Sequence, residues 1–163
     1  MQKPVSGRRA ARMLIIQGLY AWLISDAFPK DLEEELLSSH YFDMFASFEA
    51  DASVLFPPIK QVDEPYFREI LKGILQKKAV LDALLLPHLD RALEKLGPIE
   101  HAVLLLGAYE LTFRQDVPYK VAINESIDLA KLFGAQDSHK YINGVLDRLA
   151  QDKKTQKTDQ QPA

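Results

Sequence analysis

Apolar residues recur every three or four positions through most of this chain, which is the period of an amphipathic α-helix. The clearest pair of such stripes lies near the C-terminal end. The first comprises Val121, Ile123, Ile127, Leu129, Ala130 and Phe133, and the second Tyr141, Ile142, Val145, Leu146 and Leu149. Pro118 suits the start of the first helix, because its missing N–H would be unpaired there. Gly134 can take the left-handed conformation that ends a helix, and Ser138 can cap the next one.

The same reading predicts helices along the rest of the chain. They are expected at 6 or 7 to 25, 32–48, 63–86, 88–96 and 99–114. Asp63 is expected to cap the third of these, and Pro87 to end it. The segment 51–62, with Pro57 and Pro58, is expected to be a loop between two lobes. Because the alternation typical of strands is nearly absent, the sequence predicts an all-α protein.

Charge is unevenly distributed along the 163 residues. Residues 1–12 carry four basic and no acidic residues, whereas 13–150 carry 13 basic and 21 acidic ones. A basic end on an acidic body favours nucleic-acid binding at one place over binding everywhere. The last residues, 151–163, are polar and cannot bury apolar surface, so we expect one domain over 1–150 and a disordered tail.

Few of the common catalytic or metal-binding patterns occur in this chain. No two glycines lie within two positions of each other, which excludes dinucleotide and phosphate loops. The four histidines form no helical ligand pair, and the chain has no cysteine. No apolar run approaches the ~18 residues of a membrane span. We therefore expect no enzyme, no metal, no cofactor and no membrane contact, and a cytoplasmic location.

The basic N-terminus is the first candidate site. It contributes Lys3, Arg8, Arg9 and Arg12, and arginine forks match the geometry of phosphate. Gln17 and Tyr20 continue the side of the helix that carries Arg12, and Tyr20 can stack on a base. The alternatives are a solvated basic tip and, for Tyr20, the commoner case of a core tyrosine. Trp22 is assigned to the core.

The segment 133–143 is the second candidate site. Phe133, Gly134, Asp137, Ser138 and Lys140 place an aromatic ring and polar groups on a turn, the types that read single-stranded RNA. The alternative is that these residues only end one helix and cap the next. Further polar residues, Asn124, Glu125 and Asn143, interrupt the helices. Interhelical hydrogen bonds are the first expectation for these three, and RNA contact the second for Asn143.

Three groups of short sequence motifs resemble those of the NusB family of bacterial transcription antitermination factors. The last block holds VPYKVAINE, LAK-x-FGA, DSHK and NGVLD over 117–147. The N-terminus holds RRAAR followed by QGLY over 8–20, and LGPIEHAVLLLGAYEL stands at 96–111. The three groups occur in the family's order and spacing, and only 26–64 remains largely uncovered.

The resemblance implies a NusB-like fold of about seven helices in two small packed bundles. It also implies that Lys3, Arg8, Arg9, Arg12 and the 133–143 segment contact boxA RNA. The expected partners are NusE, which is a small-subunit ribosomal protein, the other Nus factors and the RNA polymerase elongation complex. Glu100 is a tentative residue of the face for NusE. Many family members carry arginine where Leu105 stands here, which would make an interface at that position more apolar.

Several alternatives stay open at this point. One is a helical adaptor that binds proteins only, for which the basic tip is incidental. Another is a detached RNA-binding domain of an RNA methyltransferase system. The free protein is either a monomer or a weak homodimer.

Overall fold

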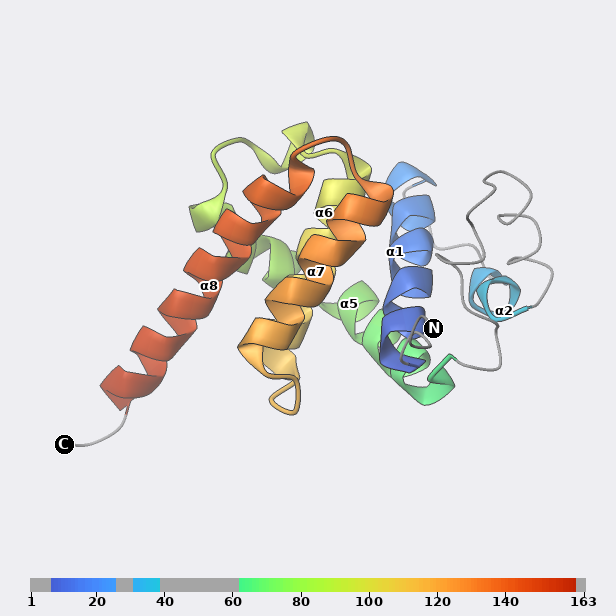
Figure 1. Ribbon diagram of the computed structural model, residues 1–163, viewed down its shortest axis with the longest axis horizontal. Helices are drawn as coiled ribbons and strands as arrows, with labels where there is room; N and C mark the ends of the chain where they lie inside the picture. The colour runs from blue at the N-terminus through green and yellow to red at the C-terminus, as the bar shows by residue number, and fades with distance from the viewer. Residues whose placement is uncertain (1–6, 26–30, 39–61, 161–163) are drawn as a thin grey trace, which may run out of the picture. The chain divides into compact units, whose positions relative to one another are not determined.

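The computed structural model describes residues 7–25, 31–38 and 62–160, with side chains to residue 154. In these ranges the regular structure consists of six α-helices and two short 3₁₀ turns, with no strand. The all-α prediction is confirmed, with a helix count close to the expected seven. The chain divides into two compact units, Met1–Gly73 and Ile74–Ala163, here called the N-terminal and C-terminal units. Figure 1 shows the helices in chain order, coloured from blue at the N-terminus to red at the C-terminus.

The N-terminal unit contains α1 (Gly7–Ser25), α2 (Leu32–Leu36) and the first part of α5 (Glu64–Leu85). Helix α1 has the predicted bounds, but ten consecutive residues from Ala10 to Leu19 are buried, not a single stripe. Helix α2 is much shorter than the predicted helix over 32–48. The Ser38 hydroxyl donates to the Glu35 carbonyl oxygen (2.7 Å), and such local bonds compete with the helical ladder. The remainder of that prediction, from residue 39, lies outside the described residues.

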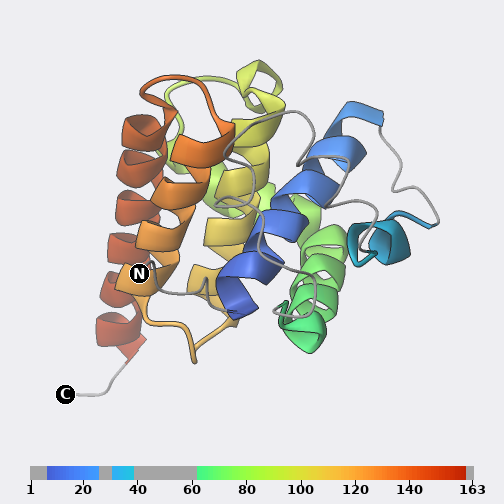
Figure 2. The same cartoon turned by 45° about the vertical axis from the view of Figure 1, so that its right-hand side comes forward.

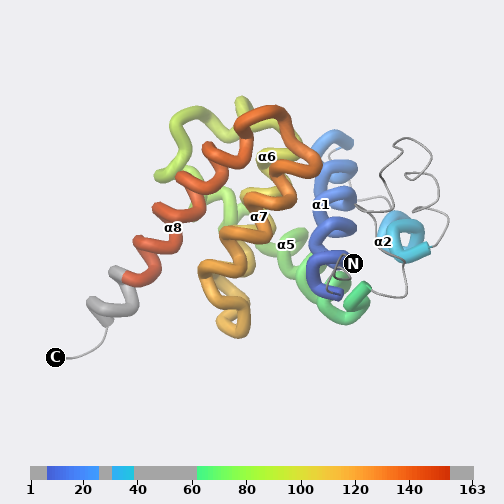
Figure 3. Tube along the Cα trace, in the orientation of Figure 1, coloured from blue at the N-terminus to red at the C-terminus, as the bar shows by residue number. Residues whose placement is uncertain are grey.

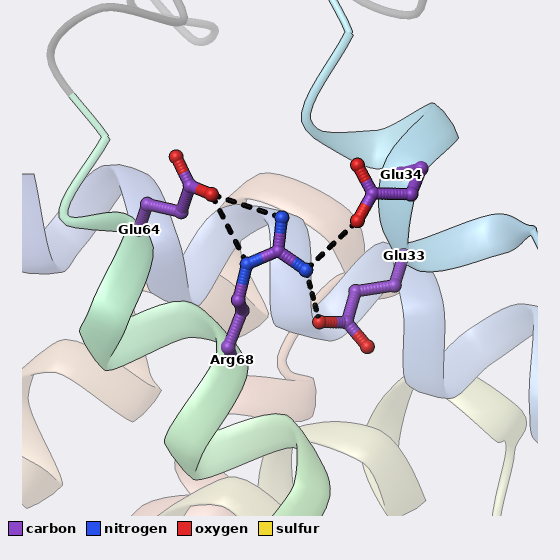
Figure 4. A network of polar contacts seen from close by, with 4 residues as sticks. All are labelled: Glu33, Glu34, Glu64 and Arg68. Carbon is purple, nitrogen blue, oxygen red and sulfur yellow. Dashed lines mark hydrogen bonds and ion pairs between the residues drawn. The ribbon is translucent and has the colours of Figure 1, made fainter.

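A network of ion pairs around Arg68 joins α2 to α5 within the N-terminal unit (Figure 4). The Arg68 guanidinium lies 2.6 Å from Glu33, 2.9 Å from Glu34 and 2.9 Å from Glu64. Hydrogen bonds to Glu34 and then Glu64 raise the pKa of Arg68 above its ordinary value. Exposed pairs contribute little individually, so the network mainly fixes where α2 lies against α5.

The starts of α1 and α5 are joined by backbone and cap bonds. The Asp63 N–H donates to the Gly7 carbonyl oxygen (3.0 Å), and the Tyr66 N–H donates to the Asp63 carboxylate (3.1 Å). The predicted Asp63 cap is confirmed. This arrangement places Tyr66, in the first turn of α5, beside the first turn of α1.

Helix α5 itself passes from one unit to the other. The boundary falls after Gly73, not in the loop over 51–62 where the sequence suggested it. One helix can supply apolar residues to two cores, which turn signals in the sequence do not reveal. The helix has non-helical dihedral angles at Lys77 and ends at Leu85, before Pro87 as predicted.

In the C-terminal unit, α6 (Pro98–Phe113), α7 (Tyr119–Phe133) and α8 (Ser138–Gln160) pack pairwise against one another (Figure 2). All three helices were predicted. Helix α8 continues to Gln160, past residue 151 where the sequence suggested a disordered tail. A helical backbone satisfies its own hydrogen bonds, so it can continue without burying side chains.

Two 3₁₀ turns, η2 (Leu86–His88) and η3 (Leu93–Lys95), replace the α-helix predicted over 88–96. Leu89 and Ala92 are extended, with ψ of 146° and 152°. These two residues therefore separate the turns, and the apolar spacing of this segment does not reflect a continuous helix.

Gly107, in the middle of α6, lies close to both α7 and α8. A Cβ atom at this position would lie 2.6 Å from Leu146 Cδ1 of α8 and 2.9 Å from Ser126 Oγ of α7. Both neighbours are completely buried. Because close-packed interiors have no room for an additional methyl group, glycine is required for this helix crossing.

A partly buried polar cluster links α5 to α6 in the same unit. Asp82 accepts from Lys78 Nζ (2.7 Å) and lies 2.7 Å from His101 Nε2. Burial raises the pKa of the Asp82 carboxyl, whereas the hydrogen bonds from His101 and Lys78 lower it. The hydrogen bonds and the nearby charges have the larger combined effect, so the pKa lies below its ordinary value.

We predict that Gly107→Ala lowers the free energy of unfolding by about 1–3 kcal/mol, because the methyl group overpacks the crossing. Urea unfolding followed by circular dichroism measures the change. Gly144→Ala in α8 is the matched control. Its Cβ would lie 3.2 Å from the end of the flexible Arg148 side chain, and alanine favours the helix, so stability should be unchanged or higher. Equal destabilisation by both variants would contradict the prediction.

We predict that Asp82→Asn destabilises the protein at pH 7 by about 1–3 kcal/mol, because His101 and Lys78 lose their charged acceptor. A carboxyl with a lowered folded pKa stabilises fully above its unfolded pKa of about 3.9, and this stabilisation is lost as pH falls through the folded pKa. The difference between wild type and variant should therefore shrink below about pH 4. Urea unfolding at pH 7 and at pH 3 tests this, and an unchanged difference would refute it.

Candidate nucleic-acid interface

Two arginines at the start of α1, Arg8 and Arg12, lie against Tyr66 of α5 in the N-terminal unit. The Arg8 guanidinium lies 4.4 Å from the centre of the Tyr66 ring, and that of Arg12 lies 5.5 Å away. Arg12 Nη2 also donates to the Tyr66 hydroxyl at 3.5 Å. A guanidinium stacked on an aromatic ring keeps its N–H groups at the edge, where they can meet phosphate.

These arginines differ in exposure. Arg8 and Arg9 are half-buried, whereas Arg12 is only 3% exposed. Arg12 is therefore part of the packing around Tyr66. Any contribution of Arg12 to RNA binding comes from the interior of the unit. Lys3, the fourth basic residue predicted for this site, lies outside the described residues.

Further along α1, Gln17 and Tyr20 have opposite environments. Gln17 is buried, and its amide nitrogen donates to the Met13 carbonyl oxygen at 3.3 Å. Tyr20 is 41% exposed, so the alternative of a core tyrosine is wrong. Tyr20 follows Arg9 by eleven residues, close to three helical turns, which places both on the same side of α1, about 16 Å apart.

The turn between α7 and α8 has an unexpected backbone conformation. Gly134 is extended, with φ of −92° and ψ of 173°, so the predicted left-handed glycine is wrong. Glycine is needed there for space, since a Cβ would lie 2.6 Å from the Ala130 carbonyl oxygen. The left-handed residue is Asp137, with φ of 69°. Aspartate tolerates this region better than most residues.

The side chains of the 133–143 segment are divided between the surface and the interior. Asp137, Lys140 and Asn143 are exposed, and Lys140 Nζ lies 3.4 Å from Asp137 Oδ1. Phe133 and Gly134 are half-buried, and Ser138 is buried. The segment therefore presents an acid, a base and an amide to solvent, within two turns at the start of α8.

Asn143 and Asn124 are both exposed, so the first expectation for them, hydrogen bonds between buried helix faces, is not met. Their polar side chains lie on the outer sides of α8 and α7. Hydrophobic periodicity alone did not separate these outward positions from the buried ones. Val121, which the sequence placed in the apolar stripe of α7, is likewise 41% exposed.

The expected partner face begins at Glu100, which is half-buried at the start of α6. Its carboxylate accepts a hydrogen bond from the Gly97 N–H at 3.3 Å and thereby caps the helix. Leu105, in contrast, is fully buried. It belongs to the core, so a more apolar interface at this position is excluded.

Tyr66 is the residue of this site that the sequence did not reveal. It is 4% exposed and lies 54 residues after Arg12, so no local pattern connects the two. An aromatic residue three positions after a helix cap was the only available signal. In the described part of the chain, no group of three potential ligands could hold a metal ion. No helix there is long and apolar enough to cross a membrane.

Comparison with known proteins places this helical architecture in the class of transcription antitermination factors. The chain belongs to the NusB family, whose model matches residues 9–151. The transcription antitermination protein NusB of Shewanella loihica is 47% identical over 144 residues, which are 88% of this chain and 95% of that protein. The NusB protein of Shewanella frigidimarina is 47% identical over 148 residues, 91% of this chain and 98% of that protein.

Solved structures agree on the fold. A structure of T. maritima NusB matches with a TM-score of 0.68 at 29% identity, covering 93% of this chain and 94% of that one. A structure of NusB and NusE in complex with double-stranded RNA matches with a TM-score of 0.67 at 22% identity, covering 88% and 96%. At that identity the second likeness shows the fold alone. Together these matches confirm the resemblance seen in the sequence, the helical fold and the expectation that the protein is no enzyme.

Proposed function

We propose that this antitermination factor binds boxA-like single-stranded RNA together with NusE and holds the nascent transcript at elongating RNA polymerase. The complex then resists termination, especially on ribosomal RNA operons in the cytoplasm, with the other Nus factors as further partners. The RNA contacts come from Lys3, Arg8, Arg9, Arg12, Gln17 and Tyr20 in the N-terminal unit, and from Phe133, Gly134, Asp137, Ser138, Lys140 and Asn143 in the C-terminal unit.

The observation that carries the proposal is the stacking of Arg8 on Tyr66. The 4.4 Å distance restricts the guanidinium before any ligand arrives. A restrained arginine loses less side-chain entropy when it binds, so its phosphate contact is stronger than that of a mobile one. In an otherwise acidic body, this cluster directs RNA to one place.

The turn at 134–137 supplies the groups that would distinguish bases. The side chains of Lys140 and Asn143 are exposed on the first two turns of α8. The first N–H groups of a helix lack intrahelical partners and suit a phosphate. Asp137 opposes RNA electrostatically, and its ion pair with Lys140 reduces this effect.

The partner in the proposal is supported by the solved complex of NusB with NusE, whose NusB chain shares this fold. An acidic body is also complementary to a basic ribosomal protein. The contact assigned to this partner is Glu100, whose carboxylate already caps α6. Contact with a partner would have to leave that cap bond in place or replace it.

We expect the Arg8→Ala/Arg9→Ala variant to bind a short boxA-like RNA more weakly and with less dependence on salt. Fluorescence anisotropy over a salt series, with and without NusE, measures both effects. About four phosphate contacts on a single strand give a log–log slope near −3, and removing two should reduce it by about 1.4. Arg12 is left intact because its burial makes it part of the packing.

The matched control is Lys72→Ala/Lys95→Ala, which removes the same charge at two exposed lysines elsewhere. It should keep the wild-type slope and the enhancement by NusE. Equal loss of binding in both variants would mean that overall charge, not the arginine site, binds RNA. Binding by the wild type that is flat with salt would favour a protein-only helical adaptor and contradict the proposal.

A further inference from the structure

A cavity of about 600 Å³ lies in the C-terminal unit, at the end of the α7–α8 pair opposite the 134–137 turn. The cavity is half open to solvent and is lined by the end of α6, the 114–118 segment, the start of α7 and the late part of α8. Among its lining residues are Leu111, Arg114, Val117, Tyr119, Lys153 and Lys154. The volume is within the range of pockets that hold small organic ligands, about 300–1,000 Å³.

One wall of the cavity is basic. Lys153 and Lys154 are neighbours on α8, and Lys154 Nζ lies 3.7 Å from the centre of the Tyr119 ring. A hydrogen bond with Lys154 lowers the pKa of the Tyr119 hydroxyl. Arg114 is already held by Asp116 through bonds of 2.9 and 3.0 Å. Arg114, Lys153 and Lys154 together give this wall its positive charge.

The start of α7 adds hydrogen-bond donors to the same place. Pro118 provides no side-chain cap, and the first helical bond runs from the Ala122 N–H to the Pro118 carbonyl oxygen. The preceding N–H groups, those of Tyr119, Lys120 and Val121, have no partner within the helix. Such groups favour a negatively charged ligand.

The other wall is apolar and carries an aromatic ring. Leu111 and Val117 lie beside Tyr119, whose side chain is 37% exposed. A basic wall next to an aromatic and aliphatic one, with Lys154 against the Tyr119 ring, fits a nucleotide, since the phosphate and the base need different surroundings. An acidic peptide would use the lysines but leave the apolar wall unpaired.

Helix α7 separates this cavity from the 134–137 turn. Its 15 residues correspond to about 22 Å. Figure 3 shows the trace of the two helices, with the turn at one end and the 114–118 segment at the other. A ligand at one end therefore does not occlude the other end.

We propose that this cavity binds one nucleotide of the RNA strand that continues beyond the boxA-like element. The phosphate contacts Lys153, Lys154 and the start of α7, and the base packs on Tyr119 and the apolar wall. This inference rests on the proposed function, because it extends the same RNA across the C-terminal unit.

The test compares two RNAs by fluorescence anisotropy on the full-length chain. One is the boxA-like element alone, and the other carries an extension of about ten nucleotides on either side. At about 3.4 Å per nucleotide such an extension is long enough to pass along α7. Wild type should bind one extended RNA about fivefold or more tightly than the short one, from the stacking of a single base.

The Lys153→Ala/Lys154→Ala variant should lose that gain and bind the short RNA as wild type does. Tyr119→Leu, which retains both lysines, should also lose most of it. The control Lys72→Ala/Lys95→Ala, with the same charge change at two exposed lysines elsewhere, should retain it.

The inference would be overturned if the Lys153→Ala/Lys154→Ala variant kept the gain in affinity. It would also be overturned if wild type bound the extended RNA no better than the short one. Loss of the gain in the control as well would assign it to overall charge and overturn it too. Failure of the short RNA to bind wild type would instead refute the proposed function itself, so the two failures are distinguishable.

Discussion

The close approach of three helices at Gly107 determines the arrangement of the C-terminal unit. Because α6 lacks a side chain there, Leu146 of α8 and Ser126 of α7 can both pack against its backbone. This crossing fixes the α7–α8 pair along its length. The two ends of the pair, the 134–137 turn and the basic cavity, are consequently held at a constant separation. A rigid separation is useful to a protein that contacts an extended strand at more than one point.

The N-terminal unit holds arginine side chains within its packed structure. Arg12 is almost completely buried, yet it has a hydrogen bond to Tyr66 and faces its ring. Burial of an unpaired charge would cost several kcal/mol, so such contacts are required for the fold to tolerate it. Arg8, on the same ring, is more exposed. The packing of one arginine thus orders another that can reach phosphate.

The sequence predicted most elements that depend on local signals. The bounds of α1 and α7, the start of α8, the Asp63 cap and the end of α5 before Pro87 follow from periodicity, capping residues and proline. The prediction from sequence failed where one local pattern is compatible with two structures. Gly134 is needed for space and not for a left-handed conformation, and Asp137 adopts that conformation in its place. The 88–96 segment has helical spacing but extended residues at Leu89 and Ala92. Tyr66 and Gly107 depend on distant contacts, and no pattern within a few residues identifies either.

We propose that clusters from both units take part in binding one RNA. Chemical-shift mapping of the labelled protein by NMR, titrated with a boxA-like RNA and NusE, tests it most directly. We expect shifts at the Arg8 and Arg9 side chains and at the backbone of residues 137–143 in the same titration. Shifts confined to one unit, or absent from both clusters, would contradict it.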